Sequence, residues 1–183
     1  LNATKGYFAK ASLTPFLNVR GTGNGMRGFF DARTYRSLGA DNRVTFALRG
    51  QLGFLAGPSL RNAPADLLFY SGGSGTVRGQ DYQSLGVDMG GQNASGGASF
   101  VGLSSEMRVK TDEKLSIVGF FDTGFIGSRA LPSASTGEWH SGAGLGVRYD
   151  TGIGPIRLDV AAPLGEPLRV RNLQVYIGIG QSF

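Results

Sequence analysis

The segment 43-RVTFALRGQLGF-54 alternates apolar and polar side chains along its whole length. Its apolar positions are Val44, Phe46, Leu48, Leu52 and Phe54. The positions between them carry Arg43, Thr45, Ala47, Arg49 and Gln51. Successive side chains of a β-strand point to opposite faces of the sheet. The segment therefore predicts a long strand with one apolar face and one polar face.

The same period of two recurs along the chain. It is clear in the segments 99–109, 115–125, 141–150, 154–162 and 173–183, and less regular in 6–17 and 28–38. Strands of about nine to twelve residues are long enough to cross a bilayer when they are tilted. No composition shift marks a domain boundary, so we predict one all-β domain over residues 1–183, with eight antiparallel strands.

Two all-β architectures fit this alternation. In a soluble β-sandwich the apolar faces form the core, whereas in a transmembrane β-barrel they face lipid. Aromatic residues near predicted strand ends favour the barrel, because they match an interfacial girdle; they are Tyr7, Phe8, Phe29, Phe30, Tyr149 and Phe183. We expect the transmembrane barrel, with a soluble sandwich that acts as a binding module as the alternative.

Composition narrows the function classes. The net charge is +5, but the 18 basic residues are scattered singly, so we expect no nucleic-acid partner. The chain has no cysteine and no run of 18 apolar residues, which argues against thiolate metal sites and a transmembrane helix. The first six residues contain no apolar signal sequence, so we expect a mature form, a fragment or a soluble protein.

Enzymatic signatures are weak throughout the sequence. His140 is the only histidine, and no G-x-S-x-G motif accompanies it. The pair Gly73 and Gly75 would need a third glycine at position 78 to begin a dinucleotide fingerprint, and that position is Arg78. We therefore expect no catalytic residues, no cofactor and no metal.

The longest gap between predicted strands, about 58–98, contains 69-FYSGGSGTVRGQDYQSLG-86. Its glycines allow tight backbone turns around a single arginine, Arg78. Alternation places two carboxylates, Glu106 and Asp122, on the polar faces of the strands that follow. A mobile glycine-rich surface loop is the alternative interpretation of this stretch.

Several sequence segments together resemble the BamA/TamA superfamily of outer-membrane assembly factors, and TamA-type proteins most closely. They are 69-FYSGG-73, 77-VRG-79, 121-FDTG-124, 154-GPIRLDVAAPL-164 and 177-IGIGQSF-183. This resemblance covers nearly the whole chain. It implies the C-terminal half of a sixteen-stranded barrel in the bacterial outer membrane, with the loop folded back into the lumen.

The resemblance also implies a site. The loop motif would be Gly72, Gly73, Val77, Arg78 and Gly79. Arg78 at its tip would bind Glu106 and Asp122, since a planar guanidinium matches carboxylates. The sequence departs from the family in two places: Gln80 replaces an aromatic residue, for which Tyr82 is a candidate substitute, and Gln181 replaces an apolar or aromatic residue.

By resemblance, the function is membrane-protein assembly or translocation without covalent chemistry. A client strand would be templated at a seam beside the terminal strand, where Gly178 and Gly180 weaken pairing and Phe183 ends the chain. The implied partners are outer-membrane lipids and client β-barrel or autotransporter proteins. A passive secretion pore of the same superfamily is the alternative.

Eight strands are too few for this account by themselves. An eight-stranded barrel closes around its own side chains and leaves no room for a loop of some forty residues. An open half-barrel leaves two unpaired edges in the membrane. We therefore expect either a preceding half-barrel that this sequence lacks or a homodimer; the sequence also contains no POTRA modules.

Overall fold

A computed structural model describes residues 2–17, 23–88, 94–165, 167 and 169–183. Its long strands are β1 (Gly6–Phe16), β2 (Gly25–Leu38), β3 (Val44–Ala56), β6 (Ser99–Lys110), β7 (Leu115–Gly127), β8 (Gly137–Tyr149), β9 (Ile156–Pro163) and β10 (Gln174–Ile179). The short elements are β4 (Val87–Asp88), β5 (Ala94–Ser95) and the 3-10 turns η1 (Ala40–Asn42), η2 (Ala65–Leu67) and η3 (Val170–Asn172). None of the helices in the described ranges is long and apolar enough to span a membrane.

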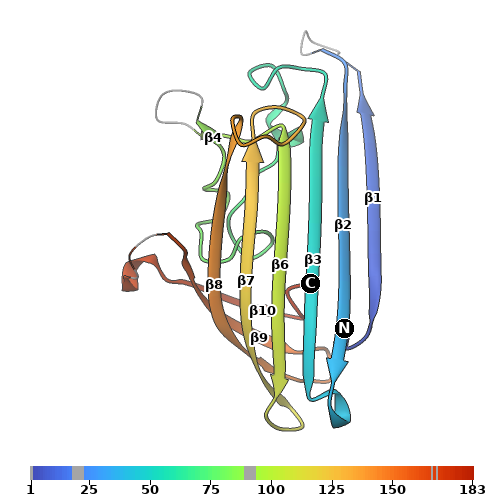
Figure 1. Ribbon diagram of the computed structural model, residues 1–183, viewed down its shortest axis with the longest axis vertical. Coiled ribbons are helices and arrows are strands. Elements are labelled where there is room, and N and C mark those ends of the chain that lie inside the picture. The colour runs from blue at the N-terminus through green and yellow to red at the C-terminus, as the bar shows by residue number, and fades with distance from the viewer. Residues whose placement is uncertain (1, 18–22, 89–93, 166, 168) are drawn as a thin grey trace.

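The eight long strands form one antiparallel sheet in the order β1-β2-β3-β6-β7-β8-β9-β10 (Figure 1). Every long strand pairs with the next one along the chain, and only β3 and β6 are separated by a long connection. This confirms the all-β class and the eight predicted strands. The strands β1 and β10 form the two edges, and among the described residues they do not pair with each other. The sheet is therefore open.

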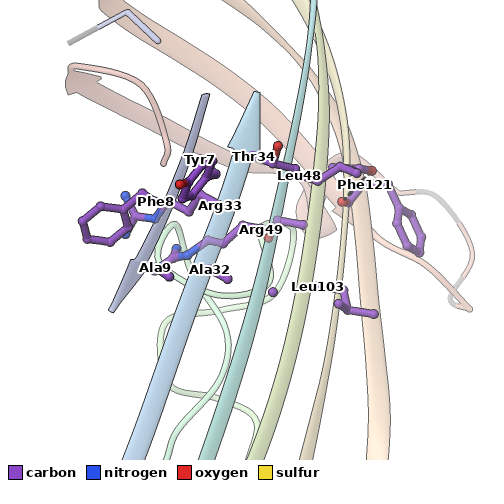
Figure 2. A pocket seen from close by; sticks show the side chains of 13 residues that line it. Tyr7, Phe8, Ala9, Ala32, Arg33, Thr34, Leu48, Arg49, Leu103 and Phe121 are labelled. Atoms are coloured by element: carbon purple, nitrogen blue, oxygen red, sulfur yellow. Dashed lines mark hydrogen bonds between the residues drawn. The ribbon is translucent and has the colours of Figure 1, made fainter. Parts of the chain in front are cut away.

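One face of the sheet, here called the outer face, is apolar and exposed. Large side chains stand on it across the strands, including Leu48, Leu52, Leu103, Phe121, Leu145 and Ile177. Figure 2 shows a hollow in this face, where small side chains such as Ala9 and Ala32 lie among Tyr7, Leu48 and Phe121. A sandwich would bury such a face under a second sheet, but the only other sheet in the described residues is the two-residue ladder of β4 and β5. The outer face is that of a membrane barrel.

The opposite face, here called the inner face, carries the charged residues and the long loop. Buried side chains on it include Asp31, Glu106, Arg108, Asp122, Arg148 and Asp159. The loop between β3 and β6 contacts inner-face residues from β2 to β10, so the sheet curls around the loop. Two apolar clusters complete this side: one is built around Phe69 and Phe100, and the other around Val118, Phe120 and Ala161.

The C-terminal end differs from the prediction. A strand was expected over 173–183, but β10 ends at Ile179. Gly180 has φ 93°, which breaks the extended backbone, and its N–H donates to the Pro155 carbonyl at 2.7 Å. The chain then turns onto the inner face, where Phe183 is buried against the Arg108 side chain. The girdle expectation is therefore wrong for Phe183, and also for Phe29, which packs with Phe69.

Candidate functional site: a buried loop motif

The glycines of the loop motif allow it to fold into a series of tight turns. Gly72, Gly73 and Gly79 have φ of 104°, 91° and 95°, a region that favours glycine. The Gly73 N–H lies 3.1 Å from both the Val77 and the Gln80 carbonyl oxygens. At Gly79 a Cβ would come within 2.5 Å of the Ala162 carbonyl oxygen. Glycine at this position therefore lets the backbone pass against β9.

Arg78 lies at the tip of this tightly turned segment and is only 1% exposed. Its Nε and Nη2 donate to the two oxygens of Asp122, at 2.7 and 3.0 Å. Its backbone N–H also donates to Asp122, at 3.1 Å, and its Nη1 donates to Glu106 at 2.6 Å. Such a bidentate, charge-assisted arrangement fixes both the position and the orientation of the guanidinium. The loop tip is thereby bound to β6 and β7.

Arg78 keeps its charge in spite of its burial. Loss of water around the side chain works to lower its pKa. The hydrogen bonds to Asp122 and the attraction of Asp122 and Glu106 outweigh that effect, so the pKa of Arg78 is raised above its usual value. The tip is therefore held as an ion pair at every pH at which the two carboxylates are ionised.

Sequence reasoning missed the aromatic partner of Arg78. The guanidinium carbon lies 3.6 Å from the centroid of the Phe120 ring, on the inner face of β7. A cation over an aromatic face gains electrostatic attraction, most of all where water is excluded. Phe120 precedes Asp122 by two residues, so alternation placed both on one face, and that signal could have identified it. The other candidate, Tyr82, is 79% exposed and does not cover Arg78.

The network extends beyond the two predicted carboxylates. Arg108 Nη2 lies 2.8 Å from the second oxygen of Glu106, and Arg148 Nη1 lies 2.5 Å from Asp159. Asp159 is also 3.5 Å from Arg78 Nη1. Three arginines thus meet three buried carboxylates, which stand on β6, β7 and β9. The positions of Arg148 and Asp159 followed from alternation, but nothing in the sequence said that they pair.

The base of the loop is held in a different way. The Phe69 ring stacks between Phe29 and Phe100, with centroid distances of 6.2 and 6.3 Å. The Arg27 guanidinium lies 4.3 Å above the Phe69 centroid, and its Nε donates to the Leu67 carbonyl at 2.9 Å. Leu55, Leu68 and Ile126 are buried in the same cluster. Sequence analysis did not predict this anchor.

The remaining predicted residues lie on or next to the terminal strand. Gly178 is on the inner face of β10, where a Cβ would stand 2.9 Å from Arg157 Nε. Gly180 and Phe183 lie beyond the strand. The Ser182 hydroxyl, in the same segment, lies 3.0 Å from Arg78 Nη1 and 2.7 Å from Arg157 Nη1. The segment after β10 therefore touches the arginine network directly.

Comparison with known proteins agrees with the fold of the sheet. The chain is similar to BamA from Haemophilus ducreyi lacking POTRA domains 1-3, with a TM-score of 0.73 and 18% sequence identity. The match covers 94% of this chain and 37% of that one, so this chain spans little more than a third of its length. The model of the Omp85 superfamily domain matches residues 1–183. These matches confirm the resemblance to the BamA/TamA superfamily, and the chain belongs to the Omp85 superfamily.

Proposed function

We propose that this chain forms part of the barrel of a factor that inserts or translocates proteins at the bacterial outer membrane, in the manner of TamA-type proteins. The observation that carries the proposal is the seated loop tip, where buried Arg78 is paired with Asp122 and Glu106. A loop fixed across the interior would narrow the path that a permanently open channel needs. A factor that changes shape around a client needs an element that can occupy defined positions.

The chemistry of the tip suits such an element. A buried ion pair repays the cost of desolvation only when its geometry is complete, and breaking one side leaves a buried charge unpaired. Arg78 comes from the loop, so its ion pairs with Asp122 and Glu106 favour two conditions, fully seated or withdrawn, over intermediate ones. This behaviour supports a role as a switchable plug.

The terminal strand supplies a surface for a client strand. β10 is an edge strand among the described residues, so its outer backbone groups are available for β-augmentation. Gly178 adds no inward side chain that would have to repack when pairing changes. The clients would be other β-barrel or autotransporter proteins, and the apolar outer face would lie against outer-membrane lipids.

The open sheet needs further strands to close. They would come from the same protein outside this sequence or from a second copy of the chain. The particle mass in detergent separates the two cases. A mass of twice the 19.2 kDa of the chain would show that two copies pair.

The proposal is tested with Arg78→Ala in proteoliposomes that contain a denatured client barrel protein. We expect assembly of the folded client to fall by at least tenfold, because Glu106 and Asp122 lose their partner and the tip cannot seat. The exposed Arg129 provides a matched control, and Arg129→Ala should assemble the client at the normal rate. Normal assembly by Arg78→Ala would refute the proposed role of the loop.

Planar-bilayer recordings separate assembly factor from secretion pore. A seated loop predicts low, flickering conductance in the unmodified protein and larger openings in Arg78→Ala. A steady open conductance in the unmodified protein would favour the pore.

A further inference from the structure

The loop motif contacts the terminal strand as well as the carboxylates. β10 pairs with β9 over six residues, from Gln174 opposite Ala161 to Ile179 opposite Ile156. Its inner face carries Gln174, Tyr176 and Gly178. The side chains of Gln174 and Tyr176 reach the loop. The edge strand is thus supported from the inner side by a segment almost a hundred residues earlier in the sequence.

Tyr176 makes the central contact. Its hydroxyl accepts a hydrogen bond from the Gly79 N–H at 3.0 Å and lies 3.3 Å from the Gln80 carbonyl, to which it can donate. Its ring packs against the buried cluster of Val118, Phe120 and Ala161. The hydroxyl therefore has one position, and in that position it satisfies two consecutive backbone groups of the loop.

Neighbouring contacts extend this one on both sides. The Gln174 side-chain amide donates to Asp81 at 2.5 Å, and the Ser182 hydroxyl lies 3.0 Å from Arg78 Nη1. The loop residues 78–81 thus each touch β10 or the segment after it. Four consecutive contacts between the same two segments mean that withdrawal of the loop removes all of them together.

We infer that Tyr176 is a positioning residue that couples seating of the Arg78 loop to pairing of the terminal strand. Coupling of this kind is reciprocal: whatever favours the seated loop favours paired β10 by the same factor, and the reverse holds too. The significance of the coupling rests on the proposed function, because a client strand could pair with β10 more readily once the loop has withdrawn. The coupling itself requires no client.

Hydrogen exchange read by mass spectrometry tests the coupling in detergent micelles without any client. In Tyr176→Phe we expect the amides of 174–179 and of 77–82 both to exchange about three- to tenfold faster, the range for one or two lost hydrogen bonds. The amides of β10 bond to β9 and not to the hydroxyl, so a local loss alone would leave them unchanged. Tyr149→Phe removes an exposed hydroxyl from the last residue of β8 and should change the exchange rate of neither segment.

A second variant approaches the coupling from the other side. Asp122→Asn weakens the grip on Arg78 from β7, because the carboxylate of Asp122 accepts hydrogen bonds from the Arg78 side chain and backbone. Faster exchange in both 77–82 and 174–179 is expected. Faster exchange in 77–82 with an unchanged β10, in either variant, would overturn the coupling while leaving the proposed function to the client-assembly assay. Unchanged exchange in both segments of both variants would overturn it as well.

Discussion

The two ends of the long loop are attached to the inner face by opposite means. At the base, Phe69 is stacked between two phenylalanines in an apolar cluster. At the tip, Arg78 is bound by two carboxylates and lies over the Phe120 ring, next to the buried side chain of Val77. The base resembles an ordinary protein core, whereas the tip is held mainly by buried charges.

This difference suggests that the base stabilises the attachment of the loop, whereas the tip can switch between positions. Apolar packing loses free energy gradually, roughly in proportion to the area that becomes exposed. A buried ion pair loses most of its benefit once a single partner moves. We therefore expect the base to keep the loop attached while the tip moves between seated and withdrawn positions. The loop would work as a hinged element with a permanent attachment and a releasable one.

The largest expected effect is at the base. Phe69→Ala removes a buried ring and leaves a cavity above Gly53, at a cost of about 3–5 kcal/mol. Hydrogen exchange should rise strongly in residues 65–71 and much less in 77–82, where the Arg78 contacts remain. The exposed Leu131, changed to alanine, is the control. Equal acceleration of exchange in both segments would show that base and tip are a single attachment and not two separate ones.

A smaller effect is expected at the tip from a single methyl group. In Gly142→Ala the new Cβ on β8 would overlap the Arg78 carbonyl oxygen, so the tip has to shift, at a cost of about 1–3 kcal/mol. Here exchange should rise in 77–82 and stay unchanged in 65–71. Gly119→Ala adds the same methyl group where its nearest neighbour, Leu145, is 3.8 Å away. It should leave hydrogen exchange unchanged in both segments. Faster exchange at the base in Gly142→Ala would contradict separate anchors.

Much of the fold could be predicted from alternation alone. A period of two placed Leu48 and Leu103 on one face and Arg49 and Glu106 on the other, because each strand exposes opposite sides to lipid and to the interior. The end of β10 was mispredicted for a related reason. Residues 180–183 continue the pattern, but a positive φ at Gly180 is invisible to periodicity.

The interior contacts of the loop were harder to predict. Composition and spacing drew attention to Arg78, yet they could not show that Phe69 fills a space above Gly53 or that Tyr176 reaches Gly79. Such contacts depend on how far the sheet curls, which brings β2 and β10 to the same loop. A single sequence contains no local signal for that curvature.

The most direct test of the seated tip uses trypsin, which cleaves after arginine. The structure buries Arg78, whereas Arg61 near the base of the same loop is exposed. The folded protein in micelles should be cut after Arg61 and resist cleavage after Arg78. In Asp122→Asn, which keeps the arginine but weakens its grip, cleavage after Arg78 should appear and release a fragment beginning at Gly79. Cleavage of the unmodified protein after Arg78 as fast as after Arg61 would contradict the account.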